Sequence, residues 1–309
     1  MKSPSSSSSA PLPHAACAAC PTASLHSLRR HGETGGETRY VVALAGNPNT
    51  GKSTVFNRLT GLKQHTGNWP GKTVGKAEGF FDFGGESYRI VDLPGTYSLA
   101  STSEDEEIAR DFILFGQPDV TVMVADATRL ERNINMVLQV LQITDRAVLC
   151  VNLIDEAERN HISIDLRALS RRLGIPVVGA SARSGRGIGE LLEAVRAVAS
   201  GTFVCRPPRG FDLPADTAAE VNRLTAAVRT AHPELSNAEW IATRLLERDE
   251  GVRRAYATPE LNALADEIHL AIGHNFHDRW MEQIYARAGE ICAAAVRRPG
   301  GDGLLPLDV

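Results

Sequence analysis

The segment from Gly46 to Ser53 constrains the fold of this chain more than any other. It reads GNPNTGKS and matches the pattern GxxxxGK[ST] in full. The apolar run 40–45 precedes it, and the helix-forming segment 52–59 follows it, which is the context that this pattern requires. Such a loop turns successive backbone N–H groups, and the positive end of a helix, toward one point. We therefore expect this loop to bind the phosphate groups of a nucleotide.

Strands and helices alternate around and after this loop, and Gly84-Gly85 predicts a hairpin turn. The predicted strands are 40–45, 80–83, 88–91, 120–125, 147–151 and 176–179. The predicted helices are 52–59, 105–115, 133–143, 165–173 and 189–198. This alternation favours an α/β fold, a six-stranded mostly parallel sheet with helices on both faces.

The chain changes character after residue 200. The segment 205–214 reads CRPPRGFDLP, which is typical of a linker, and no strand is evident beyond it. Apolar residues at helical spacing, a capping box from Ser236 to Glu239, and the pair Thr258-Pro259 predict a small all-α domain. Trp240 and Trp280 are interpreted as its core. The expected division is a disordered tail (1–38), a nucleotide-binding domain (39–200), a linker (201–215), a helical domain (216–296) and a C-terminal tail (297–309).

The composition excludes several classes of protein. The 309 residues suggest two domains, at about 150 residues per domain. The net charge of −4 argues against a broad nucleic-acid or anionic-membrane surface. No apolar run approaches the roughly 18 residues of a membrane-spanning helix. Five scattered cysteines do not form a disulfide scaffold and favour a reducing, cytoplasmic setting.

The first 38 residues contain a serine run and no apolar periodicity, which predicts disorder. Two alternatives stay open for this tail. Residues 1–32 contain no Asp or Glu, which is also a feature of organellar transit peptides. Cys17 and Cys20 form a lone CxxC pair that could bind a metal.

A second motif lies where a neighbouring strand is expected to end. Residues 90–95 read IVDLPG. An aspartate in this place can hold Mg²⁺ through water, and a glycine can bring its N–H to a γ-phosphate. We predict that Asp92 and Gly95 complete the phosphate site, in which Lys52 bridges the β- and γ-phosphates and Ser53 ligates Mg²⁺.

A third motif follows the strand 147–151. The carboxylate of Asp155 can accept two hydrogen bonds from guanine, whereas adenine offers no such pair of donors, so Asp155 predicts a preference for GTP. Leu153 replaces the lysine of the usual NKxD pattern. A surface aspartate that caps a helix is the alternative interpretation of Asp155. Segment 181–183 (SAR) follows the last predicted strand, where a backbone N–H can contact guanine O6.

The predicted nucleotide contacts are Gly46, Asn47, Asn49, Thr50, Gly51, Lys52, Ser53, Thr54, Asp92, Gly95, Asn152, Asp155, Ser181, Ala182 and Arg183.

Between the phosphate loop and IVDLPG lies a segment with the composition of a mobile loop, GNWPGKTV at 67–74. A loop here must supply one hydroxyl to the Mg²⁺ shell when γ-phosphate is present. Thr73 is the candidate for this third Mg²⁺ ligand, beside Ser53 and Asp92. Thr66 is the alternative.

One expected catalytic group is missing from the sequence. Many GTPases place glutamine after the DxxG glycine to orient water, and here that position is Thr96. Arg110 and Arg129 are in range by sequence, but we interpret both as surface residues rather than as arginine fingers.

Together these motifs resemble the cytoplasmic N-terminal GTPase region of the ferrous-iron transporter family FeoB. The resemblance rests on the segments GNPNTGKSTVFNRLTG, HTGNWPGKTV, VDLPGTYSL, SEDEEIARDF, NLIDEAER and SARSGRGI. It extends over residues 40–296 and implies a FeoB-type G domain at 39–200, followed by a helical domain that acts on nucleotide release. The family's membrane domain is not within this sequence. We therefore expect either a truncated chain or a separately encoded transport half.

The resemblance also implies a substitute for the missing finger. In related GTPases a K⁺ ion takes its place, held by an asparagine of the phosphate loop and by backbone carbonyls of the first switch. The matching groups here are Asn49 and the carbonyls of Gly67 and Trp69. Loop geometry alone is the alternative role for Asn49. The residues expected to act in catalysis are then Lys52, Asn49, Thr73 and Gly95.

The expected function is hydrolysis of GTP to GDP and phosphate, with Mg²⁺ and K⁺ as cofactors. The resemblance implies regulation of ferrous iron transport through a membrane partner in trans, in the cytoplasm or at the inner face of the plasma membrane. No nucleic-acid partner is expected. Two alternatives remain, a GTP-dependent ribosome or RNA assembly factor and a non-catalytic GTP-binding docking module.

Overall fold

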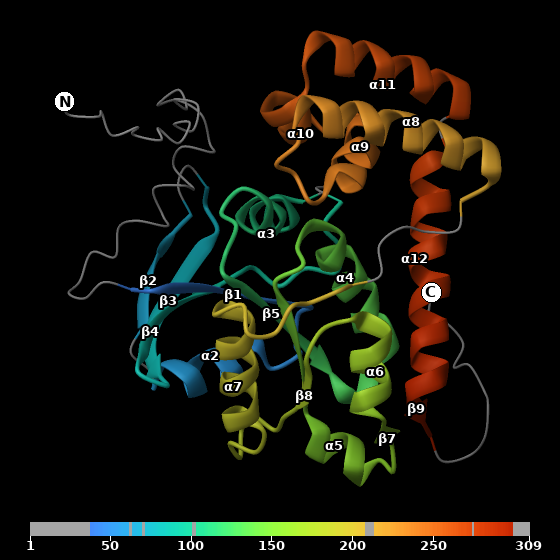
Figure 1. Ribbon diagram of the computed structural model, residues 1–309. Coiled ribbons are helices and arrows are strands. Elements are labelled where there is room, and N and C mark those ends of the chain that lie inside the picture. Colours follow the sequence, from blue (N-terminus) through green and yellow to red (C-terminus); the bar gives the residue numbers. More distant parts are fainter. Residues whose placement is uncertain are drawn as a thin grey trace, which may run out of the picture.

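A computed structural model describes residues 38–61, 64–69, 72–100, 103–207, 213–273 and 275–298. The predicted tails at 1–38 and 297–309 lie outside the described residues except for residues 38, 297 and 298, and Cys17 and Cys20 lie outside them as well. The described chain forms a seven-stranded sheet in the order β2-β3-β4-β1-β5-β6-β8 (Figure 1). Its strands are β1 (Tyr40–Gly46), β2 (Gln64–Asn68), β3 (Gly75–Phe83), β4 (Glu86–Asp92), β5 (Val120–Asp126), β6 (Ala147–Asn152) and β8 (Val177–Gly179).

Helices lie on both sides of the sheet, with α3 above and α2 and α7 below it in the view of Figure 1. The helices of this domain are α2 (Lys52–Thr60), α3 (Glu104–Leu114), α4 (Leu130–Ile143), α5 (Ile154–Arg159), α6 (Leu166–Leu173) and α7 (Ile188–Ala199), with a short 3₁₀ turn η1 (Ala127–Arg129). The predicted α/β fold is therefore confirmed.

The predicted number of strands was wrong by one. The six predicted strands are present, but β2 adds a seventh at the edge, antiparallel to β3. Its sequence, QHTGN, carries no apolar alternation, and residues 65–68 are exposed, because an edge strand that faces water needs no apolar side chains. Backbone pairing with β3 therefore decides the conformation of this segment.

The parallel part of the sheet gathers the three sequence motifs at one edge. Strands β4, β1, β5, β6 and β8 are parallel neighbours, and Leu44 of β1 is in register with Asp92 of β4. The phosphate loop follows β1, the DLPG motif follows β4, and the guanine motif follows β6. Because the carboxyl ends of parallel strands meet at one edge, the motifs come together there.

The interior strands are buried on both faces. Residues 42–45 of β1 and 147–151 of β6 are fully buried, as the continuous apolar runs predict. Cys150 lies among them, and burial raises the pKa of its thiol to about 12. The sequence interpretation of Cys150 as a buried thiol is confirmed.

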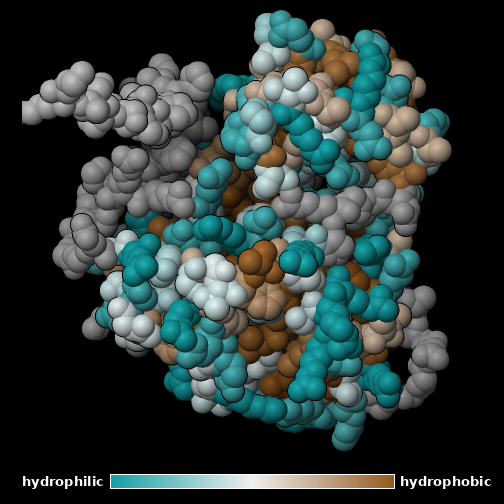
Figure 2. All heavy atoms as spheres, in the orientation of Figure 1, coloured by the Kyte–Doolittle hydropathy of each residue, from teal (hydrophilic) through white to brown (hydrophobic). Residues whose placement is uncertain are grey.

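The second domain is helical. Its helices are α8 (Ala215–Ala231), α9 (Ala238–Leu246), α10 (Glu250–Tyr256), α11 (Pro259–Ile272) and α12 (Phe276–Ala295). Trp240 and Trp280 are buried, and the Thr258 hydroxyl caps α11 by accepting the Leu261 amide at 3.2 Å. Polar side chains cover much of both domains on the face shown in Figure 2, with apolar residues showing between them.

The helix α9 starts one residue later than the predicted capping box at Ser236 implies. Asn237 is the residue before α9, and its side chain makes no capping hydrogen bond. Its amide donates instead to the Ile143 carbonyl at the end of α4, at 3.2 Å. The Asn237 side chain therefore makes a contact between the two domains.

The helix α12 returns the chain to the first domain. It packs against α4 and α6, and it descends along the sheet domain in Figure 1. It ends in a short strand, β9 (Val296–Arg297), which pairs antiparallel with β7 (Ser163–Ile164). The Asp165 amide also donates to the Ala295 carbonyl at 2.8 Å. The prediction of no strand after residue 200 was therefore wrong by this one pair.

Arg110 corrects the sequence interpretation most clearly, because it is not a surface residue. Its side chain on α3 is 2% exposed and lies between two carboxylates, Asp111 and Asp249. Asp249 precedes α10, so this ion pair joins the sheet domain to the helical domain. Arg129, by contrast, is exposed as predicted.

We predict that Asp249→Asn destabilises the chain by about 2–3 kcal/mol, because it removes one partner of a buried ion pair. Asparagine can still cap α10, where Asp249 accepts the Val252 amide at 2.9 Å, so the change isolates the charge. Urea unfolding of the whole chain measures the loss. Glu250→Gln, at an exposed neighbouring position, is the control, and equal stabilities for the two variants would contradict the prediction.

Candidate functional site

The phosphate loop joins β1 to α2 through a strained turn. Asn49 and Gly51 have positive φ angles of 65° and 80°. Thr50 closes the turn by donating its hydroxyl to the Asn47 carbonyl at 3.0 Å. A Cβ at Gly51 would stand 2.4 Å from Nδ2 of Asn152, so only glycine fits this position. The loop thus has the cradle shape that a phosphate group requires, and the buried Nδ2 of Asn47 has no hydrogen-bond partner among the described residues.

Lys52 and Asp92 form an ion pair in this cradle. Both side chains are mostly buried. Burial raises the pKa of Asp92, and the charge of Lys52 opposes that rise. Gly95 lies beside the same loop, since a Cβ there would stand 3.3 Å from Cα of Pro48. The structure therefore brings together the phosphate loop and the DLPG motif, as the sequence predicts.

Asn152 ties this cradle to the base-reading segments. Its Nδ2 donates to the Thr50 carbonyl at 2.9 Å, and its Oδ1 accepts the Ala182 amide at 3.0 Å. The side chain is 1% exposed, so both hydrogen bonds are protected from water. Asn152 thus holds the phosphate loop and the segment 181–183 in fixed relation.

Asp155 lies in the first turn of the short helix α5, which follows Leu153, a residue with a φ of 62°. Its Oδ2 lies 3.7 Å from Arg159, and its buried Oδ1 has no hydrogen-bond partner among the described residues. The Ser181 hydroxyl holds the pKa of Asp155 below its ordinary value. An ionised carboxylate with an unpartnered oxygen suits a ligand that offers N–H donors.

The segment 181–183 lies beside Asp155. Ser181 and Ala182 are buried and Arg183 is exposed. The Ala182 amide, one of the backbone N–H groups of the segment predicted to contact guanine O6, donates to Asn152 in this structure. A bound base would therefore share or exchange that hydrogen.

The predicted switch residues lie far from this segment in the sequence. They are on β2 and in the turn after it. Thr73 is exposed, and its hydroxyl donates to Glu104 of α3 at 3.5 Å, so the structure does not join it to Ser53 and Asp92. Thr66 and Gly67 are on β2. The Trp69 indole is buried and packs edge-on against the ring of Phe112, with 5.6 Å between the two ring centroids.

Two contacts of this turn could not be predicted from the sequence. The Trp69 carbonyl accepts the Lys72 amide at 3.0 Å, and Lys72 pairs with Glu107 of α3 at 2.8 Å. Both acidic partners, Glu104 and Glu107, lie in the first turn of α3, where negative charge also favours the helix dipole. Thr96 is buried with its hydroxyl 3.9 Å from the Met136 sulfur, so its side chain is turned away from water.

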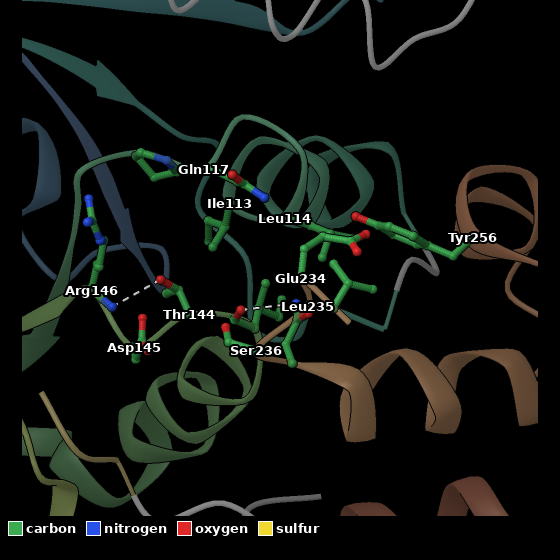
Figure 3. Close-up of a pocket in the computed structure, with 13 residues that line it drawn as sticks. Ile113, Leu114, Gln117, Thr144, Asp145, Arg146, Glu234, Leu235, Ser236 and Tyr256 are labelled. Atoms are coloured by element: carbon green, nitrogen blue, oxygen red, sulfur yellow. Dashed lines mark hydrogen bonds between the residues drawn. The ribbon is translucent and has the colours of Figure 1, made fainter. Parts of the chain in front are cut away.

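A separate cleft of about 320 Å³ lies between the two domains (Figure 3). It is lined by the ends of α3 and α4 and by residues 234–237 and Tyr256 of the helical domain. Because β6 begins just after Arg146, this cleft is at the amino-end edge of the sheet. None of the predicted site residues is among those that line it.

Comparison with known families matches both domains. The family model for ferrous iron transport protein B matches residues 40–195, and the model for the FeoB cytosolic helical domain matches residues 214–297. The chain belongs to the FeoB family. Its first domain is a P-loop GTPase-type G domain of that family.

The curated relatives are longer than this chain. The Fe(2+) transporters FeoB of Escherichia coli K12 and of Salmonella typhimurium are each 45% identical over 161 residues. That match spans 51% of this chain and 21% of each relative. The similarity therefore concerns about a fifth of a FeoB transporter.

Solved FeoB structures match both domains in three dimensions. A point mutant of S. thermophilus NFeoB bound to GDP has a TM-score of 0.75 at 28% identity, covering 84% of this chain and all of that one. The cytosolic domain of L. pneumophila FeoB has a TM-score of 0.73 at 30% identity with the same coverage. That of T. maritima FeoB in a GMPPNP form has a TM-score of 0.70 at 32% identity, covering 84% and 99%. Within the described residues of this FeoB chain, no helix has the length and hydropathy needed to cross a membrane.

We predict that Asn152→Ala lowers the free energy of unfolding of this FeoB chain by about 1–3 kcal/mol, because it leaves the Thr50 carbonyl and the Ala182 amide unpaired. Denaturant unfolding without nucleotide measures the loss. Asn160→Ala removes an exposed asparagine after α5 and serves as the control. A loss no larger than that of the control would show that the two loops are held by other contacts.

Proposed function

We propose that this chain binds GTP and hydrolyses it to GDP and phosphate, as the nucleotide switch of a ferrous-iron transport system. The observation that carries the proposal is that the phosphate loop and the segment 181–183 are held together in one site. Asn152 links the phosphate cradle to the segment beside Asp155, and the cradle and Asp155 each retain an unpartnered polar atom among the described residues. FeoB proteins of known structure are described as bound to GDP or in a GMPPNP form, which supports the same ligand here.

In this mechanism the chain's own residues position the nucleotide and neutralise its charge. Lys52 leaves Asp92 and meets the β- and γ-phosphates, while the Gly95 N–H senses the γ-phosphate. Asp155 accepts the N1–H and N2–H of guanine. The hydrolytic water is not oriented by Thr96, whose hydroxyl faces Met136.

Mg²⁺ fits the site because Ser53, Thr73 and Asp92 offer the hard oxygen ligands that it prefers, and when bound it would neutralise phosphate charge. Thr73 must first leave Glu104. K⁺ fits Asn49 and the carbonyls of Gly67 and Trp69, because a carbonyl oxygen that accepts one N–H keeps a second lone pair. It would supply a fixed positive charge in place of an arginine finger.

The regulatory role rests on the family. The relatives are named Fe(2+) transporters, and the match covers about a fifth of their length. We infer that this chain regulates ferrous iron transport by a membrane partner, from the cytoplasm or from the inner face of the plasma membrane. The Arg110–Asp249 ion pair and the β7–β9 pair are among the contacts that attach the helical domain to the G domain.

We predict that the wild-type chain hydrolyses GTP and not ATP, and that Asp155→Ala abolishes this preference. Loss of two hydrogen bonds to the base is expected to raise the KM for GTP at least about tenfold. Steady-state phosphate release with each nucleotide measures both values. Because the pKa of Asp155 lies below 3.8, the preference should persist from about pH 8 to about pH 5 and fade only as the carboxylate protonates. A GTP preference that survives Asp155→Ala would overturn the guanine assignment.

We predict that K⁺ accelerates GTP hydrolysis more than about tenfold over Na⁺, and that Asn49→Ala removes this difference, because a cation then lacks its side-chain ligand. The measurement is kcat in matched KCl and NaCl buffers. Asn57→Ala, on α2 outside the phosphate loop, is the control variant. An equal kcat in both salts, together with an unchanged kcat for Asn49→Ala, would contradict the potassium assignment.

A further inference from the structure

The loop Ser181–Gly187, called the guanine loop below, is held from three different elements. From β6, Asn152 accepts the Ala182 amide at 3.0 Å. From α5, Glu158 accepts two hydrogen bonds from Arg186, each 2.8 Å long. From α2, Arg58 donates its Nη2 to the Ser184 carbonyl at 3.1 Å. The first two elements carry the guanine motif itself, whereas the third is the helix of the phosphate loop.

The guanine loop is closed on itself and so can shift as a unit. The Ser181 carbonyl accepts the amides of Ser184 at 3.1 Å and of Gly185 at 2.9 Å. The Ser181 amide donates to the Arg186 carbonyl at 3.0 Å. A contact at the tip, Ser184–Gly185, therefore constrains Ser181 and Ala182, the residues beside the base-reading Asp155.

The guanidinium of Arg58 lies directly over Gly185. A Cβ at position 185 would stand 2.3 Å from Nη2 and 3.1 Å from Cζ of Arg58, so a side chain there would displace the guanidinium. Arginine suits this contact because its planar group can lie flat on exposed backbone while it donates to a carbonyl. The glycine and the arginine thus form a matched pair from two distant parts of the sequence.

Arg58 is on α2, so its hydrogen bond to Ser184 connects the guanine loop to the helix of the phosphate loop. The helix α2 begins at Lys52, in the phosphate cradle, and ends at Thr60. One rigid element therefore contacts the phosphate site with its first residue and the guanine loop with its last turn. A nucleotide must contact both places at once, so their separation sets how well it fits.

We propose that Arg58 is a positioning residue for nucleotide binding. It fixes the guanine loop relative to the phosphate helix, and it thereby slows the release of the base. This inference rests on the proposed function, because it concerns how the same guanine nucleotide is held. Arg58 itself touches neither the phosphates nor the base.

The test compares Arg58→Ala, Arg58→Lys and the wild-type chain. Arg171→Ala, which removes an exposed arginine of α6, is the matched control for the lost charge. The dissociation rate of a fluorescent GDP analogue is measured by chase with excess GDP. Inhibition of its binding by tripolyphosphate, which has no base, reports the phosphate cradle alone. Thermal unfolding without ligand reports general stability.

We expect Arg58→Ala to release GDP about fivefold to tenfold faster, in line with the loss of one exposed hydrogen bond. The affinity for tripolyphosphate should stay within about twofold of wild type, since the cradle is untouched. Arg58→Lys keeps a donor but not the flat guanidinium, so its release rate should lie between the two. Arg171→Ala should match the wild type in all three measurements.

Four results would overturn the proposal. GDP release from Arg58→Ala at the wild-type rate would show that the other two contacts suffice to hold the guanine loop. Equal losses for GDP and tripolyphosphate, or a lower unfolding temperature than that of Arg171→Ala, would assign Arg58 a general structural role. Absence of GDP binding by the wild-type chain would overturn the proposed function as well, whereas wild-type binding with an unaltered Arg58→Ala overturns this inference alone.

Discussion

The buried amide of Asn152 joins two loops that no local interaction could bring together. One of its atoms serves the phosphate loop and the other serves the guanine loop, and the side chain is almost fully shielded from water. A hydrogen bond lost in such a place leaves a buried group unsatisfied, which costs more than the bond itself contributes. Gly51 has no side chain because Asn152 occupies that space. The shape of the nucleotide site therefore depends on one side chain at the end of β6.

The charged groups of this site are paired with one another in the structure. Lys52 neutralises Asp92, and Lys72 neutralises Glu107. The Thr73 hydroxyl donates a hydrogen bond to Glu104. Each of the side chains Lys52, Asp92 and Thr73, which the proposed mechanism directs to phosphate or Mg²⁺, thus has a partner within the protein. In the proposed mechanism nucleotide binding exchanges these partners, since a bare buried charge would be costly. The proposed exchange at Thr73 would release its contact with Glu104 on α3, the helix that also carries Arg110.

The two domains are joined by polar contacts as well as by packing. Arg110 on α3 reaches Asp249, Asn237 reaches the end of α4, and β9 pairs with β7. These contacts lie along the helical domain from its second helix to its last residue pair. The helical domain is therefore attached to α3, to the end of α4 and to β7, and these attachments give the proposed regulation a physical path.

Part of this structure could be predicted from the sequence alone, because it depends on local chemistry. The phosphate loop, the DLPG motif and the guanine motif are short runs whose function depends on residue type and spacing, and continuous apolar runs identify strands that are buried on both faces. The sequence could not reveal that Arg110 is buried, that the Asn237 side chain binds the end of α4, or that the polar segment Gln64–Asn68 forms an edge strand. Partners 139 residues apart for Arg110, and 126 for Arg58, are chosen by the packing of whole elements. The sequence by itself determined which groups are suited to meet a nucleotide, because those groups act through their own chemistry. Only the tertiary structure decided which side chains hold them in place, because a hydrogen bond or an ion pair depends on the position of both partners.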